Sequence, residues 1–419
     1  MTKWLEKTLG EVTSFMKKGI PPKYTVEESE KTIRVLNQKC NRNFEISYSE
    51  SRLHDCEKKI VPADKMLRAG DVLINSTGIG TAGRVAQVVE VKGPTTIDGH
   101  MILLRPSEEL NPIYYGYAVK AFQSQIEGLA EGSTGQTEIN RMRLQDEVII
   151  KYPKDKLVQE NIGRFLSNID DKIKTNTEIN KNLEEQAQAI LTSFFIDFSQ
   201  FGGTVPDDWK QGTLQDIANF SNGYAFKSKE LLNTSEPNCY QVFKQGHINR
   251  GGGFNSSGTK SWYPISKSSA LSKYVLHKGD VLMAMTDMKD NVAILGNTAL
   301  MAVDDQYIVN QRVGLLRSNG YKSTSYAYIY LLTNSLNFLK DLRSRANSGV
   351  QVNLSSSEIK DSSVWIANDE VNEEFNALTE PLLSMIMTND IENQKLIDLR
   401  DTLLPKLMSG ELDVSNINL

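Results

Sequence analysis

The sequence predicts an α+β fold, with two tandem mixed α/β domains separated by two long helices. Three observations support this prediction: a length of 419 residues, ordered matches between the two halves, and two helical segments with coiled-coil spacing. The length is about twice that of a typical domain. An apolar fraction of 39% is sufficient for real cores, and 24% charged residues argue against a wholly disordered chain.

The two halves match each other in order, at offsets that drift from 205 to 213 residues. The matched pairs are Trp4-x3-Thr8-Leu9-x5-Phe15 with Trp209-x3-Thr213-Leu214-x5-Phe220, Gly70-Asp71-Val72-Leu73 with Gly279-Asp280-Val281-Leu282, and Leu103-Leu104-Arg105 with Leu315-Leu316-Arg317. Such ordered matches indicate a tandem duplication, hence a pseudo-twofold internal repeat. A solenoid would need shorter and more numerous repeats.

The first part of each repeat reads as a compact mixed α/β domain, over residues 1–155 and 199–367. Short β-branched runs such as 71–74, 85–91 and 147–150 predict strands. Segments 114–126 and 325–342 predict helices at matching places in the two halves.

The second part of each repeat, 156–198 and 368–419, predicts a long helix. Apolar residues recur alternately four and three apart, which is the spacing of a coiled-coil seam. The predicted seam residues are Ile162, Ile169, Ile173, Asn176, Asn180, Leu183, Leu382, Ile386, Asn389, Asn393, Leu396 and Leu403. The two asparagines in the middle of each helix favour pairing of the helices with each other over packing only on their own domains. Pro381 and Pro405 are expected to kink or shorten the second helix, and Gly410 to end it.

The net charge of −5 is unevenly distributed. Residues 1–155 carry 22 basic and 21 acidic side chains, and residues 200–367 carry 17 and 13. Residues 368–419 carry 3 basic and 11 acidic side chains. The helices are therefore not expected to lie against phosphates, whereas the two domains are free to do so.

Signals for catalysis, cofactors and metals are weak. Gly78–Gly83 spells a dinucleotide fingerprint, but a strand-like run follows where the fingerprint needs a helix, so a hairpin is favoured. Cys40, His54 and Cys56 do not have zinc-site spacing. We predict no catalytic residue, no metal and no cofactor in this chain.

Composition also bears on compartment. No run approaches the roughly 20 apolar residues of a membrane span. The first residues lack the apolar block of a signal peptide, and three cysteines suit a reducing cytoplasm. We therefore expect a cytoplasmic protein.

Polar loops with groove-reading chemistry occur at corresponding places in both halves. Base edges are read by Asn, Gln, Arg, Lys and short hydroxyl side chains, and phosphates by Lys and Arg. The candidate DNA-binding residues are Asn37, Lys39, Arg42, Asn75, Ser76, Thr77, Arg84, Ser133, Thr134, Gln136, Lys227, Lys244, Gln245, His247, Asn249, Arg250, Thr286, Lys289, Asn291, Arg343, Arg345 and Asn347.

Five segments together resemble the DNA-specificity subunits of type I restriction–modification enzymes. Segment 207–217 is similar to their domain-opening signature, 69–73 and 278–282 to their central strand, 132–136 to the loop before their last strand, and 399–412 to their C-terminal signature. The lead-in to each helix departs from the family, since only Pro153 and Gln159 survive in the first half and residues 367–370 lack it.

The resemblance implies two target-recognition domains, 1–155 and 199–367, separated by an antiparallel pair of conserved helical spacers, 156–198 and 368–419. Each domain would read half of a bipartite double-stranded DNA site through the major groove. The helices would dock two methyltransferase subunits, and restriction subunits would join them. S-adenosylmethionine, ATP and Mg would be held by those partners, and this chain would be a non-catalytic, nucleoid-associated prokaryotic protein.

The length of the predicted helix gives an estimate of the distance between the two half-sites on DNA. The 33 residues from 162 to 194 span roughly 50 Å of helix, which corresponds to about 15 base pairs. Three alternatives stay open: a recognition subunit of another restriction class, a nucleotide-binding enzyme using Gly78–Gly83, and a coiled-coil scaffold without DNA contact.

Overall fold

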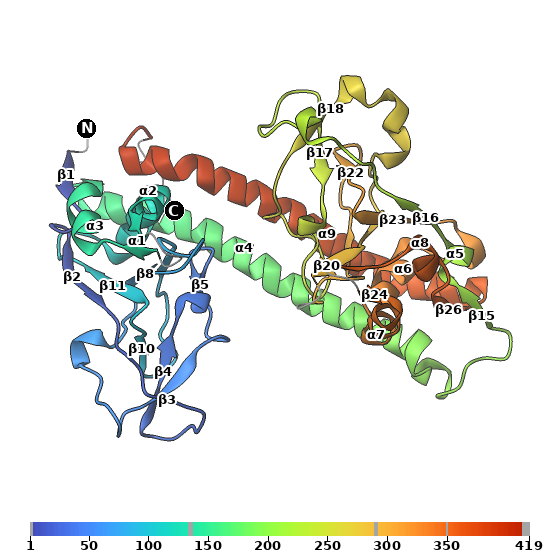
Figure 1. Ribbon diagram of the computed structural model, residues 1–419, viewed down its shortest axis with the longest axis horizontal. Helices are drawn as coiled ribbons and strands as arrows, with labels where there is room; N and C mark the ends of the chain where they lie inside the picture. The colour runs from blue at the N-terminus through green and yellow to red at the C-terminus, as the bar shows by residue number, and fades with distance from the viewer. Residues whose placement is uncertain (1–2, 133–136, 289–291, 349–350, 413–419) are drawn as a thin grey trace. The chain divides into compact units, whose positions relative to one another are not determined.

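The computed structural model describes residues 3–132, 137–288, 292–348 and 351–412 (Figure 1). The chain divides into two compact units. Unit 1 comprises Met1–Lys172 and Leu396–Leu419, and unit 2 comprises Ile173–Lys395. Both boundaries fall inside a long helix, so each unit contains part of each helix.

Unit 1 is built on two four-stranded sheets. The first is antiparallel, in the order β2 (Thr13–Lys18), β11 (Met101–Pro106), β8 (Val72–Asn75) and β9 (Val85–Gln87). The second has the order β10 (Thr95–Ile97), β4 (Thr32–Leu36), β7 (Arg52–Asp55) and β3 (Tyr24–Thr25), with β10 parallel to β4. Shorter pairs are β1 (Trp4–Thr8) with β14 (Ile149–Pro153), β5 (Asn41–Arg42) with β6 (Glu45–Ile46), and β12 (Ala130–Glu131) with β13 (Glu138–Ile139). The helices of the domain are α1 (Pro112–Ala121), α2 (Gln123–Gly128) and α3 (Arg141–Glu147).

Unit 2 repeats this arrangement. Its antiparallel sheet has the order β16 (Ala218–Asn222), β23 (Val313–Ser318), β19 (Val281–Ala284) and β21 (Thr298–Leu300). Its second sheet has the order β18 (Trp262–Pro264), β17 (Cys239–Phe243) and β22 (Tyr307–Val309), with β22 parallel to β17. Smaller sheets join β15 (Lys210–Thr213) with β26 (Ser363–Ile366), and β20 (Thr286–Met288), β25 (Gln351–Asn353) and β24 (Asn347–Ser348). The helices are α5 (Leu214–Ile217), α6 (Tyr326–Thr333), α7 (Leu336–Arg345) and α8 (Ser356–Lys360).

The matching strand orders confirm the predicted internal repeat and the α+β class. Each predicted helix of the domains is broken into two, α1 and α2 in unit 1 and α6 and α7 in unit 2. The break in unit 1 is at Phe122, whose φ of −98° and ψ of 10° are not helical. In unit 2 it is at Asn334 and Ser335, where Ser335 caps α7 by accepting from the Phe338 N–H at 3.4 Å.

Both units contain the same ion pair, between a buried aspartate that directly precedes one central strand of the antiparallel sheet and an arginine on the other. In unit 1, Arg105 Nε donates to Asp71 Oδ1 at 2.9 Å. In unit 2, Arg317 Nε donates to Asp280 Oδ1 at 2.7 Å. Each arginine also donates to a backbone carbonyl of the segment before its aspartate, that of Met66 or Val275. The repeated Gly-Asp-Val-Leu and Leu-Leu-Arg motifs thus encode one structural element.

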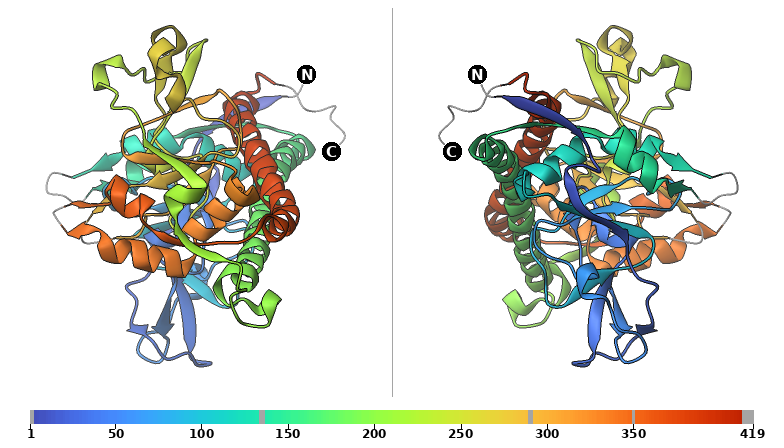
Figure 2. Two further views of the ribbon diagram at one scale, coloured as in Figure 1. Left: turned by 90° about the vertical axis from the view of Figure 1, so that its right-hand side faces the viewer. Right: turned by 90° about the vertical axis from the view of Figure 1, so that its left-hand side faces the viewer.

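The two long helices are α4 (Lys156–Leu191) and α9 (Asp369–Ser409). Figure 2 shows them side by side. The start of α4 and the end of α9 contribute Ile162, Leu166 and Leu407 to the core of unit 1. The end of α4 and the start of α9 contribute Leu191 and Phe375 to the core of unit 2. The helices therefore pair with each other and also pack on the domains.

The prolines of α9 do not shorten the helix, which is one of the two outcomes that the sequence predicts for them. Neither Pro381 nor Pro405 ends the helix, which runs on to Ser409. Both prolines are exposed, as are Ala377 and Asp401, whose carbonyls lose the helical hydrogen bond and lie where water can bind. Gly410, with a φ of 76°, follows the last helical residue, as predicted.

The starts of the two long helices place an amide side chain at corresponding positions. Gln159 Nε2 donates to the Pro153 carbonyl at 2.8 Å in unit 1. In unit 2 the matching residue is Asn372, whose Nδ2 donates to the Lys322 carbonyl at 2.7 Å. An amide therefore anchors the start of both helices, although the residues before it differ.

Within the described residues, every helix is too short or too polar to cross a membrane.

Candidate nucleic-acid interface

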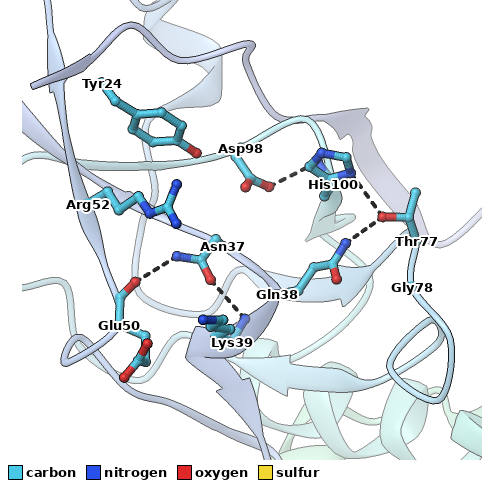
Figure 3. A pocket seen from close by; sticks show the side chains of 10 residues that line it. All are labelled: Tyr24, Asn37, Gln38, Lys39, Glu50, Arg52, Thr77, Gly78, Asp98 and His100. Carbon is cyan, nitrogen blue, oxygen red and sulfur yellow. Dashed lines mark hydrogen bonds between the residues drawn. The ribbon is translucent and has the colours of Figure 1, made fainter. Parts of the chain in front are cut away.

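A polar pocket of about 480 Å³ opens in unit 1 where β4, β7, β8 and the β10–β11 turn meet (Figure 3). The 3-10 helix η1 (Gln38–Cys40) follows β4 and forms one wall. The residues that line the pocket are Tyr24, Asn37, Gln38, Lys39, Glu50, Arg52, Thr77, Gly78, Asp98 and His100. Three of these, Asn37, Lys39 and Thr77, belong to the predicted DNA-binding set.

Two of the predicted base readers hold the loop after β4 in place. Asn37 caps η1, because its Oδ1 accepts the Lys39 N–H at 2.9 Å and its Nδ2 donates to the Glu50 carbonyl at 2.6 Å. Asn75 is buried, and its Nδ2 donates to the Gln38 carbonyl at 3.2 Å. Ser76 is also fully buried. Asn75 and Ser76 therefore shape the loop and are closed off from solvent, whereas Asn37 is half-buried and also lines the pocket.

A hydrogen-bonded chain joins Gln38, Thr77 and His100 across the pocket wall (Figure 3). Gln38 Nε2 donates to Thr77 Oγ1, and Thr77 Oγ1 lies 3.0 Å from His100 Nδ1. Thr81 Oγ1 approaches Gln38 Oε1 at 3.4 Å. The amide of Gln38 is thus held on both of its polar atoms while lining an open pocket.

The opposite wall of the pocket combines an aromatic ring with charges of both signs. The Arg52 guanidinium lies 5.0 Å from the centre of the Tyr24 ring. Asp98 is only 5% exposed, and burial raises the pKa of its carboxyl. Burial likewise raises the pKa of Tyr24, with a contribution from Asp98. Lys39 and Arg52 are exposed cations at the mouth.

Unit 2 has the same arrangement after β17. The 3-10 helix η6 (Gln245–His247) follows Lys244, and Thr286 at the start of β20 donates from Oγ1 to Gln245 Oε1 at 2.7 Å. Gln245 Nε2 in turn donates to the Thr286 carbonyl. Gln245 and Thr286 therefore correspond to Gln38 and Thr77, at offsets of 207 and 209 residues.

His247 was predicted to contact DNA, but the structure buries it completely. Its Nδ1 accepts the Lys244 N–H at 3.0 Å, and its ring stacks on Phe254 with centroids 6.3 Å apart. Burial lowers the pKa of His247 to about 4, so the ring is neutral at pH 7. It is a structural residue of the turn.

Several predicted arginines are bound to backbone carbonyls. Arg84 Nη2 donates to the Gly80 carbonyl at 2.8 Å, and Arg343 Nε to the Leu295 carbonyl at 2.8 Å. Arg345 pairs with Asp341, and Asn249 Nδ2 donates to the Phe254 carbonyl at 3.0 Å. Arg84, Arg343 and Asn249 therefore hold loop backbone, and Arg345 is paired within α7.

The remaining predicted residues fall into two groups. The exposed cations are Lys39, Arg42, Lys227 and Arg250, with Lys244 half-buried. Outside the described residues lie Ser133, Thr134, Gln136, Lys289 and Asn291, and the side chain of Asn347 is not described either.

The predicted DNA-binding set omits Gln38, Arg52 and His100, which line the pocket. Gln38 had a usable signal, because it follows a strand by two residues at the position that Gln245 occupies in the second half. Arg52 and His100 had none, since strand pairing alone brings them beside the loop after β4.

The Gly78–Gly83 segment connects antiparallel strands β8 and β9, as predicted for a hairpin. No helix starts at its end, so the dinucleotide-binding alternative is not supported. Gly83 has a φ of 87°, and a Cβ there would lie 2.6 Å from the Glu127 Cα. The glycine permits α2 to pack closely on this turn.

Of the residues weighed as zinc ligands, His54 has partners at both ring nitrogens. His54 Nδ1 accepts the Lys23 N–H at 2.8 Å, and its Nε2 lies 2.7 Å from the Lys59 carbonyl. Cys40 is buried. In the part of the chain that the structure describes, no three His, Cys, Asp or Glu side chains gather where they could hold a metal.

The predicted seam residues all lie buried or half-buried along α4 and α9. Within unit 2 the seam is polar at its centre. Asn176 Nδ2 donates to Asn393 Oδ1 at 2.9 Å, and Asn389 Nδ2 donates to Asn180 Oδ1 at 2.7 Å. The later residue of α4 pairs with the earlier residue of α9, so the two helices run antiparallel. Within unit 1 the pair is joined by Arg400 Nη1, which donates to Asp170 Oδ1 at 2.6 Å.

Two carboxylates lie beside this polar seam in unit 2. Tyr330 Oη donates to Glu184 Oε2 at 3.2 Å, and Asn180 Nδ2 donates to Asp390 Oδ1 at 2.9 Å. Burial raises the pKa of Glu184 to about 7. Burial, with a smaller contribution from the Glu184 charge, also raises the pKa of Asp390 to about 7.

We expect unit 2 to lose stability as the pH rises through 7. The folded state binds more protons than the unfolded chain between about pH 4 and 7, because both carboxyls have raised pKa values in the fold. The stabilising contribution is complete below pH 4 and is lost above pH 7. The double substitution E184Q/D390N should therefore raise the free energy of unfolding at pH 8 by about 1–3 kcal/mol and flatten its pH dependence.

Urea unfolding at pH 5 and pH 8 measures this difference. Glu185→Gln is the matched control, because its side chain is 65% exposed and should leave the pH dependence unchanged. Equal pH dependence in the double variant and the wild type would contradict the prediction.

Comparison with known proteins identifies the family. The model of the type I restriction modification DNA specificity domain matches residues 1–185 and 206–397. The type I restriction enzyme MjaIX specificity subunit of Methanocaldococcus jannaschii is 24% identical over 392 residues, covering 89% of this chain and 83% of that protein. The HindI specificity subunit of Haemophilus influenzae is 24% identical over 313 residues, covering 62% and 68%.

A solved structure shares the fold. The S subunit of a type I restriction–modification system from M. genitalium has a TM-score of 0.58 at 17% identity, covering 97% of this chain and 96% of that one. The family match includes both repeats, which defines a DNA specificity protein with two copies of one domain. The chain belongs to the type I restriction modification DNA specificity domain family.

Proposed function

We propose that this chain is the sequence-specific DNA-recognition subunit of a type I restriction–modification complex. Its recognition domains, residues 1–155 and 199–367, each bind one half of a bipartite DNA site through the major groove. The observation that carries the proposal is the recurrence of one polar cluster, with Gln38 and Thr77 in one domain and Gln245 and Thr286 in the other. Family membership supplies the ligand class.

The cations of the predicted set, together with Arg52, are the proposed phosphate contacts. Lys39 and Arg52 line the pocket of the first domain and Arg42 is exposed on β5, while in the second domain Lys227 and Arg250 are exposed and Lys244 is half-buried. Phosphate contacts fix the register of a protein on the duplex, whereas base-edge contacts supply sequence preference. The loops that contain Ser133, Thr134, Gln136, Lys289 and Asn291 remain predicted DNA contacts.

The helical spacers are the proposed docking surface for two methyltransferase subunits. Apolar side chains are exposed on both helices, at Leu157, Ile179, Leu378, Met385 and Leu399. Residues 368–419 are strongly acidic, which favours a protein partner over phosphates. In this proposal the partners bring S-adenosylmethionine, and the restriction subunits bring ATP and Mg. This chain acts without catalysing a reaction, at the nucleoid in the prokaryotic cytoplasm.

Methylation by the reconstituted complex is expected to mark a split motif with two fixed halves and an unspecified gap. Two separate reading domains joined by helices can specify two short sequences but not the bases between them. Single-molecule sequencing of DNA methylated by the chain and its modification subunit measures the motif. Exchange of residues 1–155 for those of a relative should change one half only, and exchange of 199–367 should change the other.

The exchange experiment contains its own control, because each chimera keeps the untouched half-site as an internal reference. A single continuous motif would contradict the proposal, since it would mean that one domain alone reads bases. Complex formation without any methylation would favour the scaffold alternative.

A further inference from the structure

We propose that Gln38 and Gln245 each read an adenine, one in each half of the DNA site. This inference rests on the proposed function and deepens it by naming the base and the side chains. It follows from the hydrogen bonds that fix the two amide groups and from the donor and acceptor that each amide keeps available.

The amide of Gln38 is held in one orientation. An amide side chain has two N–H donors and two acceptor lone pairs. One Gln38 Nε2 hydrogen is donated to Thr77 Oγ1, and Thr81 Oγ1 takes up part of the capacity of Oε1 at 3.4 Å. Where His100 Nδ1 accepts the Thr77 hydroxyl proton, that hydroxyl can only accept from Gln38. Among the residues that the structure describes, one N–H and one lone pair of Gln38 are left, and the side chain lines the open pocket (Figure 3).

The amide of Gln245 is held equivalently by different atoms. Its Nε2 donates to the Thr286 carbonyl, and its Oε1 accepts from the Thr286 hydroxyl at 2.7 Å. This pair of contacts also fixes which polar atom is which, because the carbonyl can only accept. Counting partners in the described part of the chain, one N–H and one lone pair of Gln245 again remain, and its side chain is half-buried and so partly accessible to a ligand.

A fixed amide with one donor and one acceptor complements the major-groove edge of adenine. Adenine presents the N7 acceptor beside the N6 amino donor, which an amide binds through two hydrogen bonds. Guanine presents two acceptors, so its O6 would face the oxygen lone pair of the glutamine. An amide that threonine contacts prevent from flipping cannot adapt to that second pattern. Neighbouring Lys39 and Arg250 are exposed cations suited to phosphates on the same strand or the next.

The first test compares the methylated motifs of variants. In Q38A, one specified A·T pair of the first half-site should become degenerate, while the second half-site stays unchanged. Q245A should have the reverse effect, so each variant is the control for the other. A motif that Q38A leaves intact, or that loses a G·C position instead, would overturn the inference for that half.

The second test needs no variant that might fail to fold. The wild-type complex is titrated with duplexes in which one half-site adenine at a time is replaced by 7-deazaadenine, which lacks the N7 acceptor. We expect one position in each half to weaken binding by about 5- to 100-fold, since a good bidentate pair contributes a discrimination of that order. Q38A should bind the normal and the substituted duplex of its half equally.

Different results would overturn the glutamine assignment and the proposed DNA-recognition function. Specific binding that no adenine substitution weakens, or half-sites without adenine, would overturn the glutamine assignment and leave the DNA-recognition role standing. Absence of sequence-specific binding by the whole complex would overturn the proposed function itself.

Discussion

Removing the carboxylate of Asp71 is expected to lower the free energy of unfolding of the first domain by about 3–5 kcal/mol, because it leaves Arg105 charged and unpaired inside the protein. The Asp71 side chain is 3% exposed and that of Arg105 is 12% exposed. The Arg105 guanidinium also donates to the Asp64 and Met66 carbonyls, so it cannot swing out to water without breaking those bonds. D71A should therefore unfold at much lower urea concentration than the wild type.

The second repeat supplies a graded comparison. Arg317 is paired with Asp280 in the same geometry, but its side chain is 32% exposed. Water reaches this guanidinium more easily, so D280A should cost less than D71A. Lys17→Ala is the surface control, since the Lys17–Asp64 pair is 54% and 45% exposed and should contribute less than about 1 kcal/mol. Equal losses for Lys17→Ala and D71A would contradict the burial argument.

A double substitution separates the charge from the packing. Replacing both Asp71 and Arg105 with apolar residues removes the buried charges together, and such replacements are often close to neutral. We expect D71L/R105M to recover most of the stability that D71A loses. Failure to recover it would mean that the carbonyl contacts of Arg105, rather than the ion pair, hold the segment before β8.

The residues of these ion pairs belong to the sequence segments from which the duplication was predicted. The matched Gly-Asp-Val-Leu and Leu-Leu-Arg segments identified the duplication, and their partners turned out to be each other. Apolar residues that recur every two positions predict a strand, and those that recur every 3.5 positions predict a paired helix. These patterns can be read from the sequence alone, because they reflect which face of the element is buried. The α+β class, the internal repeat and the helix pair could therefore be inferred from one sequence, whereas the order of the strands comes from the structure.

The candidate interface was less predictable, because its polar residues look alike in sequence whether they face water or hold a turn. Asn75 and His247 were grouped with Lys39 and Arg250, yet the first two are buried. Their partners lie on other strands or turns, such as Gln38 for Asn75. Whether such a polar side chain is buried or exposed depends on residues that are distant in the sequence, and the local sequence pattern does not contain that information. Repeat alignment at the Gln38 and Gln245 positions would have been the better guide.

Lengthening both helices by seven residues at matched points is expected to widen the gap between the half-sites by about three base pairs. Seven residues add about 10 Å of helix, and one base pair rises about 3.4 Å. Seven residues also make nearly two full turns, so the seam faces the same way beyond the insert. The hydrogen bonds of Asn176 with Asn393 and of Asn180 with Asn389 define the matched points as after Ile173 and after Lys395.

The control is the same insert in one helix only. It shifts the seam so that Asn176 and Asn180 face apolar positions of the other helix, and unpaired buried amides are costly. That variant should fold poorly or lose methylation, whereas the double insert should methylate a motif with unchanged half-sites and a longer gap. An unchanged gap from an active double-insert complex would show that the helices join the reading domains without setting their spacing on DNA.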